Sequence, residues 1–413
     1  MDPAPRLDLR SLLTRAEAAA PVGVVDSMAA SMTEMLGAHG VSFLIADLSG
    51  RSLNRLGHSE ANGEPGSRSE ETAERVRLDG TAYGEALAEQ RSVVLRQGED
   101  TCLIVPVTSR GEAVGVLELV LPFEPAPETL EDVELAAHQL AYMVIANRRY
   151  TDLFEWGQRT VPLSLAAEIQ RRLLPAAYTC EADQFTLAGW LEPAGEVGGD
   201  TFDFSLDRET LHISMTDAMG HSVRSALLAT LVVGALRNAR RRSADLIGQA
   251  QSAHEALAEY AIDDGFVTGQ LVRVDLVDQV ATVVNAGHPR PFRLRDGRAE
   301  EIELTAQQPF GASRGATWST QAFPLEAGDR VLFLTDGMLE RNAEELDIPE
   351  LMLASAHLHP REAIQFLTRA VLDAVDGDLR DDATSLCFDW HGGQQGDRIT
   401  HAGAEHRVQR AAL

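Results

Sequence analysis

The chain has 413 residues, which predicts two or three domains, each long enough to bury its own core. Its 36 basic residues, all of them arginine, are outnumbered by 63 aspartates and glutamates, which gives a formal net charge of −27. This acidity disfavours binding to nucleic acid or to an anionic membrane surface, because both repel an acidic protein at long range. With 44% hydrophobic and 24% charged residues, the composition also excludes a wholly disordered chain.

Cysteine spacing and the N-terminal segment indicate the compartment. Cys102, Cys180 and Cys387 lie far apart and form no CxxC pair, which argues against a disulfide framework and against a structural zinc site. The N-terminal segment lacks the basic-then-apolar pattern of a signal peptide, and the longest apolar stretch, around 227–236, is about half of the ~20 residues that span a bilayer. We therefore expect a cytoplasmic protein that is not exported.

The first domain is expected at residues 18–150, after an N-terminal extension at 1–17. Apolar residues recur there with helical spacing in some segments and as strand-like runs in others, which is typical of a compact α+β unit. The predicted elements are a helix at 21–39, a strand at 41–50, a polar loop at 51–79, a helix and a strand within 81–95, a hairpin at 101–121 that turns at 110–112, and a long helix at 127–156.

A linker at 151–180 is expected to carry one short helix, at 164–174, that ends before Pro175. Helical periodicity gives this helix an apolar face. The residues on that face are Leu165, Ile169, Leu173 and Leu174.

Beyond the linker the pattern changes to short strands interrupted by three helices, which predicts a second domain at 181–390 and a disordered tail at 391–413. Strands clustered around long paired helices indicate antiparallel sheets covered by helices. The strands are predicted at 184–194, 211–217, 266–276, 281–295 and 329–337, and the helices at 223–241, 245–262 and 360–376.

Acidic residues recur at the ends of apolar strands in the second domain, each beside glycine or another small residue. A strand end can hold a carboxylate rigidly, and a small neighbour lets backbone and metal approach closely. Four such segments that converge could bind two Mg²⁺ or Mn²⁺ ions through oxygen atoms. The segments are GEVGGDTFDF (195–204), ISMTDAMGHS (213–222), LFLTDGMLERN (332–342) and RDDATSLCF (380–388).

These four segments in this order resemble the metal-dependent protein phosphatases of the PPM family, in their bacterial SpoIIE/RsbU-type branch. Two further segments share the resemblance, AAEIQRRLLP (166–175) and NAGHPRPFRLR (285–295). The resemblance implies an α-β-β-α sandwich of two antiparallel sheets flanked by helices, within a chain of the α+β class. It also implies two divalent cations, Mn²⁺ or Mg²⁺, that activate a water molecule for in-line attack on a phosphoserine or phosphothreonine.

Matching the motifs residue by residue assigns five positions to the metal site. The resemblance implies bridging carboxylates at Asp200 and Asp217, and a main-chain ligand at the carbonyl group of Ala218. Asp336 and Asp381 match the remaining acidic ligands. The same four aspartates are therefore the expected catalytic residues.

Other residues within these motifs are expected to support the site rather than to bind metal. Ser222 departs from the family pattern, because it stands where glycine is common, and it can begin the following helix as its N-cap. The supporting residues are Glu196, Asp203, His221, Asn285, His288, Glu340 and Asp382, together with Gly198 and Gly199.

The first domain resembles a GAF sensor domain in the order of its helices, strands and hairpin. This resemblance implies an α/β sensor that binds an unknown small molecule or serves in dimerisation, so a homodimer through the GAF and linker helices is a candidate assembly. Cys102 lies inside an apolar strand, where a buried structural thiol is expected.

Together the two resemblances imply a regulated Ser/Thr phosphoprotein phosphatase, whose substrate would be a STAS-domain anti-anti-sigma factor in bacterial partner switching. Two alternatives stay open. GGDTF (198–202) resembles the GGDEF signature of diguanylate cyclases, although Thr201 replaces its second acid and a cyclase would not require the later NAGHP, LTDG and RDDAT segments. The chain could also be an inactive sensor that only binds a partner.

Overall fold

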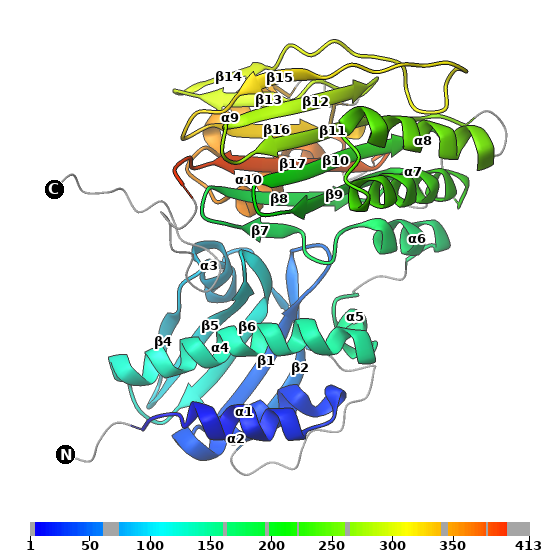
Figure 1. Cartoon of the computed structure of the whole chain (residues 1–413). Coiled ribbons are helices and arrows are strands. Elements are labelled where there is room, and N and C mark those ends of the chain that lie inside the picture. The colour runs from blue at the N-terminus through cyan, green and yellow to red at the C-terminus, as the bar shows by residue number, and fades with distance from the viewer. Residues whose placement is uncertain are drawn as a thin grey trace. The chain divides into compact units, whose positions relative to one another are not determined.

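The computed structural model describes residues 5–60, 74–159, 163–194, 198–220, 223–260, 265–339, 346–376 and 379–394. These residues form two compact units, one within 1–162 and one within 163–399 (Figure 1). The boundary divides the segment expected to be a linker, because residues up to 162 group with the first unit and the helix after them with the second. No helix within the described ranges is long and apolar enough to cross a membrane.

The first unit is built on a six-stranded antiparallel sheet with the strand order β3-β2-β1-β6-β5-β4. The predicted hairpin is confirmed, and it turns at Arg110 and Gly111, whose positive φ angles of 53° and 81° suit a tight turn. The strands are β1 (Gly40–Ala46), β2 (Ser52–Glu60), β3 (Arg75–Arg77), β4 (Val93–Gln97), β5 (Asp100–Ser109) and β6 (Glu112–Leu121), and the helices are α1 (Leu9–Ala18), α2 (Val24–Leu36), α3 (Ala82–Glu89), α4 (Pro127–Asn147) and α5 (Leu153–Gly157).

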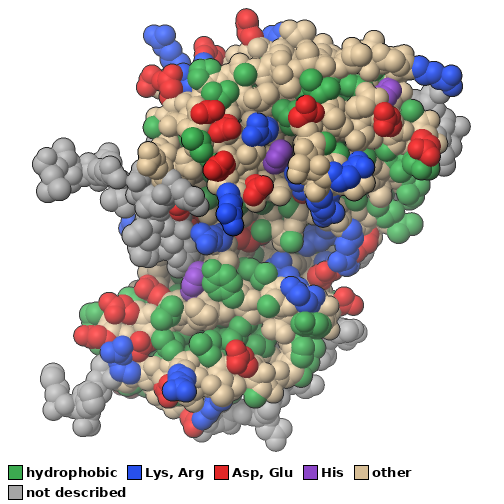
Figure 2. Space-filling model, in the orientation of Figure 1, with side chains coloured by type: hydrophobic (Ala, Val, Ile, Leu, Met, Phe, Trp, Pro, Cys, Tyr) green, Lys and Arg blue, Asp and Glu red, His purple; other side chains and the backbone are tan. Residues whose placement is uncertain are grey.

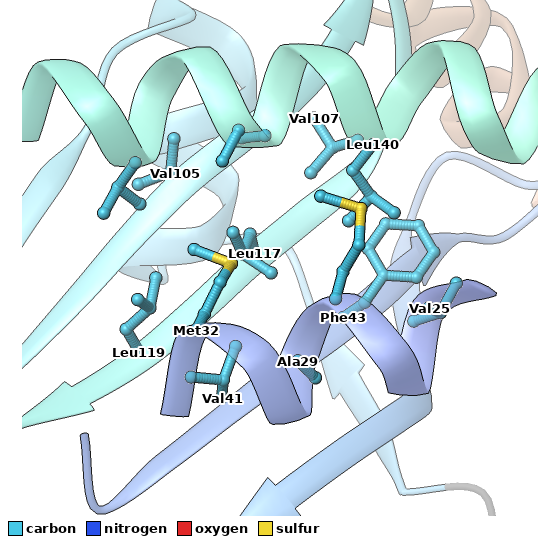
Figure 3. Packing of buried hydrophobic residues seen from close by; sticks show 14 of the residues in the cluster. Val25, Ala29, Met32, Val41, Phe43, Val105, Val107, Leu117, Leu119 and Leu140 are labelled. Atoms are coloured by element: carbon cyan, nitrogen blue, oxygen red, sulfur yellow. The ribbon is translucent and has the colours of Figure 1, made fainter. Parts of the chain in front are cut away.

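Both faces of this sheet are buried. Helices α1, α2 and α4 cover one face, and Figure 3 shows Leu140 of α4 packed toward Phe43 of β1 and Met32 of α2 packed toward Leu117 of β6. Helix α3 covers the other face, where Leu44 and Ile104 are buried. Because successive strand residues point to opposite faces and both faces are covered, β1 is buried up to its last residue and is apolar except at Ser42.

Two expectations for the first half of this unit are wrong. The extension at 1–17 belongs to the fold, since α1 buries Leu12 in the core. The segment 51–79 is not a single polar loop, because it contains strands β2 and β3. Its few apolar residues, such as Leu53, are buried in the sheet between polar neighbours.

The long helix expected at 127–156 is interrupted. Helix α4 ends at Asn147, and a 3-10 turn at Arg148–Tyr150 leads to Thr151, whose extended backbone (φ −155°, ψ 144°) breaks the helical path. Helix α5 then packs on the same unit through Phe154, which is fully buried in the core. The described part of this segment therefore closes the first unit.

The second unit has four layers, helices on sheet on sheet on helices, as expected (Figure 1). One sheet has the order β15-β12-β11-β10-β9 and the other the order β14-β13-β16-β17-β8-β7. The strands are β7 (Thr179–Glu181), β8 (Phe185–Glu192), β9 (Asp200–Leu206), β10 (Thr210–Ala218), β11 (Val267–Asp275), β12 (Val280–Ala286), β13 (Phe292–Arg295), β14 (Arg298–Glu301), β15 (Gln321–Pro324), β16 (Arg330–Leu334) and β17 (Ala383–Trp390). The helices are α6 (Leu165–Leu173), α7 (Val223–Arg241), α8 (Leu246–Tyr260), α9 (Ile348–Ala354) and α10 (Pro360–Ala374).

Three apolar clusters hold these layers together. The central cluster lies between the two sheets and includes Phe202, Met215 and Phe388. A second cluster packs α7 and α8 onto the five-stranded sheet, and a third packs α9 and α10 onto the six-stranded sheet. Each sheet is therefore covered on both faces, which places the ends of the strands at the edges of the sandwich.

The strand predicted at 281–295 is two strands in different sheets. Gly287 adopts a positive φ of 74° directly after β12, and Pro289 and Pro291 interrupt pairing further along. Strand β12 therefore stays in the five-stranded sheet while β13 joins the six-stranded one. This crossing of the chain brings NAGHP to the space between the sheets.

Candidate metal centre

Asp200 and Asp217 lie directly opposite each other on β9 and β10. Side chains two residues apart along a strand share a face, and the next residues on that face, Phe202 and Met215, belong to the core between the sheets. Both carboxylates therefore face the space between the sheets, at one edge of the sandwich. The register brings together the two aspartates that the sequence predicted as neighbours.

Two threonines from the opposite sheet hold the Asp200 side chain. Thr335 and Thr384 each donate a hydroxyl hydrogen bond to its Oδ2, over 2.7 and 2.6 Å. Burial, followed by the charges of Asp217 and Asp382, raises the pKa of Asp200 well above its ordinary value. The threonine hydrogen bonds work in the opposite direction, because they stabilise the ionised form.

Asp217 is poised to change protonation near neutral pH. Burial, followed by the charges of Asp336, Asp381 and Asp382, raises its pKa to about 7. In the part of the chain that the structure describes, no arginine forms an ion pair with Asp200, Asp217 or Asp336. These acids therefore repel one another without a basic counter-charge, a condition that a divalent cation relieves.

Two glycines let the acidic segments meet at backbone distance. A Cβ atom on Gly337 would lie 2.1 Å from the carbonyl oxygen of Asp382, so glycine is required where the segment carrying Asp336 passes the start of β17. A Cβ atom on Gly199 would lie 2.6 Å from the carbonyl oxygen of Ala218. The expected main-chain ligand thus lies against the loop that leads into β9.

The four predicted carboxylate ligands differ in burial: Asp200 is buried, Asp217 and Asp381 are half-buried, and Asp336 is exposed. Asp336 begins a 3-10 turn after β16 and is exposed. Asp381 is half-buried, and its Oδ1 accepts a hydrogen bond of 2.8 Å from the backbone N–H of Asp382. The predicted ligands therefore run from the buried base of the site to its open rim.

Asp382 accepts hydrogen bonds from segments that surround the predicted metal ligands. Its carboxylate accepts hydrogen bonds from the backbone N–H groups of Ala194 and Gly199, over 2.9 and 3.3 Å, and from Nε2 of Gln170, over 2.5 Å. The same Nε2 donates to the carbonyl oxygen of Asp200, over 2.8 Å. Asp382 thus fixes the glycine loop before β9, which agrees with the supporting role predicted for it.

Gln170 is the residue that sequence reasoning missed. Helix α6 buries Ala166, Ala167 and Gln170, whereas Leu165, expected on the buried face, is 66% exposed. In the sequence, Gln170 follows Ala166 and Ala167 by about one helical turn, so it lies on the same face of the helix. Only the fold shows that this face is the buried one. Through Gln170, α6 contacts the backbone of the first metal-site aspartate.

The other predicted supporting residues lie in three kinds of place. Asp203 lies on the opposite face of β9 from Asp200, where it forms ion pairs with Arg237 and Arg240 at 2.9 and 3.1 Å. Asn285 and His288 are buried behind the acids, between the sheets. Glu196, His221, Ser222 and Glu340, like most of the tail at 391–413, lie outside the described residues.

The chemistry of this donor set fits hard divalent cations. Carboxylates and a backbone carbonyl are the oxygen ligands that Mg²⁺ and Mn²⁺ prefer. Among the described residues, no three His, Cys, Asp or Glu side chains are arranged as a ready ion site. The charges of neighbouring aspartates nevertheless raise the pKa values of Asp200 and Asp217.

Family models match both units of the chain. The model described as Stage II sporulation protein E (SpoIIE) matches residues 207–391, and the GAF domain model matches residues 21–144. The SpoIIE match includes Asp217, Asp336 and Asp381, whereas Asp200 lies ahead of it.

Two phosphoserine phosphatases of Bacillus subtilis (strain 168) are similar to this chain. RsbU is 22% identical over 230 residues, which cover 54% of this chain and 68% of RsbU. RsbP is 22% identical over 186 residues, which cover 44% of this chain and 46% of RsbP. The chain thus spans about two thirds of the first relative and under half of the second.

Solved structures similar to the second unit include the PP2C phosphatase domain of SpoIIE from Bacillus subtilis, with a TM-score of 0.44 and 18% identity over 51% of this chain and 66% of that one. The RsbU and RsbW domains of a Mycobacterium tuberculosis protein give a TM-score of 0.45 and 22% identity over 52% of this chain and 63% of that one. The chain therefore carries a GAF domain followed by a SpoIIE-type phosphatase domain, and it is homologous to the phosphatases RsbU and RsbP.

Proposed function

We propose that this chain is a Mn²⁺- or Mg²⁺-dependent phosphatase that acts on phosphoserine or phosphothreonine in a protein. The observation that carries the proposal is the pairing of Asp200 with Asp217 across β9 and β10, facing the space between the sheets with raised pKa values and no arginine partner among the described residues. Groups with strongly shifted pKa values cluster at functional sites.

The proposed roles follow from position. Asp200, Asp217, Asp336, Asp381 and the carbonyl group of Ala218 would hold two divalent cations. When bound, such cations supply a water nucleophile near neutral pH and neutralise charge on a transferring phosphoryl group. Hydroxyl donors on the opposite sheet would keep the innermost carboxylate ionised and fixed in direction, and they are Thr335 and Thr384.

For the substrate we propose a phosphorylated STAS-domain anti-anti-sigma factor, in the cytoplasm. The support is the relationship to RsbU and RsbP, which are named as phosphoserine phosphatases. The formal net charge of −27 also disfavours nucleic acid and anionic membranes as partners, because both would be repelled.

The GAF domain is proposed as the regulatory unit, through a small ligand, dimerisation or both. On the face under α3, Arg55 and Tyr83 both donate hydrogen bonds to the Glu118 carboxylate, and a ligand there would meet this polar network. Burial raises the pKa of Cys102 to about 11, so its protonated thiol is unsuited to metal binding at neutral pH.

Helix α4 presents a seam suited to a second copy of the chain. Leu135, Tyr142 and Ile145 are 45%, 44% and 39% exposed, and their spacing of seven and three residues matches the a and d positions of a coiled coil. Figure 2 shows hydrophobic side chains gathered on the face of the GAF unit over which α4 runs. A homodimer that buries this seam is the assembly we propose.

Regulation could reach the metal site through α6, whose Gln170 contacts both Asp200 and Asp382. In the proposed scheme, a signal that shifts α6 changes the geometry of the first bridging carboxylate. Alanine replacements at Ile169, Leu173 and Leu174 that left both the basal rate and its regulation unchanged would count against this route.

The direct test incubates the purified chain with phosphorylated STAS proteins, with and without Mn²⁺, beside the variants Asp200→Ala and Asp336→Ala. Manganese-dependent phosphate release that is lost in both variants supports the proposal. Equal turnover by all three proteins contradicts it. A parallel assay for cyclic dinucleotide formation from GTP separates the diguanylate cyclase alternative, and stable binding of the phosphoprotein without turnover would favour the inactive sensor.

A further inference from the structure

His288 lies at a closed bend between the two sheets of the phosphatase domain. Its backbone N–H donates to Oδ1 of Asn285 over 2.8 Å, and Nδ2 of Asn285 donates back to the carbonyl oxygen of His288 over 3.0 Å. The Asn285 side chain therefore locks the bend that Gly287 makes with its positive φ of 74°. The backbone that carries the imidazole is therefore held in place by Asn285.

One end of the imidazole contacts β11, the strand that pairs with the one carrying Asp217. Its Nδ1 lies 2.9 Å from the hydroxyl oxygen of Thr268 on β11. Thr268 is the residue directly opposite Asp217 in the ladder of β10 and β11. One end of the ring is thereby tied to the cross-strand neighbour of a proposed bridging carboxylate.

The other end of the ring faces the second sheet. The Nε2 atom is buried and, among the described residues, has no hydrogen-bond partner of ordinary geometry. The backbone of Leu334 on β16 nevertheless lies close enough to act on the ring and favours its protonated form, as a carbonyl oxygen does. Leu334 directly precedes Thr335 and Asp336, so this contact lies at the base of a second ligand segment.

The ring is neutral in this setting, because burial lowers the pKa of His288 to about 3. A neutral imidazole has one accepting and one donating nitrogen. A neutral ring can accept from the Thr268 hydroxyl group at Nδ1 while its Nε2–H points toward the backbone of Leu334. At 3% exposure the residue is almost entirely enclosed, and its two ring nitrogens face Thr268 and Leu334, so we assign it no direct contact with substrate.

We propose that His288 is a positioning residue that spans the two sheets and sets the distance between the strands carrying Asp217 and Asp336. The inference rests on the proposed function, since it assigns His288 to the same cation site. Two carboxylates from different sheets can share cations only if the gap between their strands is fixed, and side-chain packing alone leaves that gap adjustable at the polar edge. Residues that orient metal ligands in this way are worth about 10–100-fold in metal affinity.

The experiment compares His288→Leu with His254→Leu in the full chain. His254 is a matched control, because it is also buried, at 7% exposure, and its Nδ1 accepts a hydrogen bond of 3.1 Å from the backbone N–H of Gly311. It lies on α8, which packs on the outer face of the five-stranded sheet rather than between the sheets. Mn²⁺ binding is measured without turnover, by the electron paramagnetic resonance of the free ion. Phosphate release and the thermal melting temperature are measured beside it.

We expect both variants to lower the melting temperature, and only His288→Leu to raise the Mn²⁺ concentration for half-saturation, by about 10–100-fold. His288→Gln restores a side-chain donor near Leu334 and should recover part of the affinity. Equal Mn²⁺ affinity in His288→Leu and His254→Leu overturns the inference while leaving the proposed function intact. Absence of Mn²⁺ binding by the unaltered chain overturns both.

Discussion

Buried acids lie at both ends of the paired strands β16 and β17, but the charged groups around them differ. At one end Asp389 forms a bidentate pair with Arg330, over 2.7 and 2.9 Å, and both side chains are at most 5% exposed. Arg330 also donates to the carbonyl oxygens of Ser355 and Leu358 before α10. At the other end Asp200 and Asp217 meet other acids, and neither forms an ion pair with an arginine in the described part of the chain.

The difference separates architecture from function. A buried carboxylate with an arginine partner and satisfied hydrogen bonds needs nothing more, and it ties a sheet to its covering helices. Buried carboxylates that raise one another's pKa values are a cost to the fold unless a counter-charge joins them. We therefore interpret the first end as structural and the second as the cation site.

The largest effect is expected at the unpaired end. Asp217→Asn removes a proposed bridging ligand and should lower Mn²⁺-dependent phosphate release more than about 100-fold, because supporting residues alone are worth about 10–100-fold. The folded fraction should not fall, since the substitution also removes a repelling charge. Phosphate release measured at equal folded concentration, beside circular dichroism, checks this. A variant that kept a tenth of the activity would contradict the assignment of Asp217 as a bridging metal ligand.

The opposite pattern is expected at the paired end. Arg330→Met leaves the Asp389 carboxylate buried without its partner and should lower the free energy of unfolding by about 3–5 kcal/mol. Activity per folded molecule should stay unchanged, because the pair lies at the far end of the strands. Urea denaturation with and without Mn²⁺ measures the loss. Destabilisation below about 1 kcal/mol, or a specific loss of Mn²⁺ affinity, would contradict the structural interpretation.

The next effect is a dependence on pH. Folding raises the pKa of Asp217 from 3.8 to about 7. Between these values the folded chain holds a proton that the unfolded chain has lost, so the metal-free protein loses stability as pH rises through this window. Cations compete with the same proton, so Mn²⁺ affinity should rise by up to about tenfold per pH unit below pH 7 and level off above it. Calorimetric titration from pH 5.5 to 8 tests this, and an affinity that fell with rising pH would refute it.

The smallest effect is expected from the hydroxyl donors to Asp200. Thr335→Val and Thr384→Val each remove one hydrogen bond that favours the ionised carboxylate. Each bond is worth about 0.5–1.5 kcal/mol, so the Mn²⁺ concentration for half-maximal activity should rise about two- to tenfold. Thr305→Val, in the loop after β14, is the control expected to show no change. Identical Mn²⁺ dependence in all three variants would argue that Asp200 is held by other contacts.

Much of this architecture could be predicted from the sequence, because the apolar periodicity of a helix or strand is set by residues close together in the chain. The helices at 223–241 and 360–376 and the strand at 266–276 are confirmed with small shifts at their ends. The pairing of Asp200 and Asp336 with neighbouring glycines is also a local pattern, so the sequence predicted these two positions. Gly199 and Gly337 are needed there because another backbone segment passes too close for a Cβ atom.

What the sequence did not disclose depends on contacts between distant segments. The buried role of Gln170 depends on Asp382, which lies 212 residues away, and no local periodicity encodes that distance. The change of sheet at Gly287 was likewise hidden in a run that reads as one strand. Helix α1 was missed because its burial depends on the sheet it meets.

The most direct test of the central claim is a count of bound ions. Calorimetric titration of the metal-free chain with Mn²⁺ at pH 7.5 should show binding to two sites, and the same titration of the double variant Asp200→Asn, Asp217→Asn should show no specific binding. Equal binding by the two proteins, or none by the unaltered chain, would contradict the account of this edge of the sandwich as a cation site.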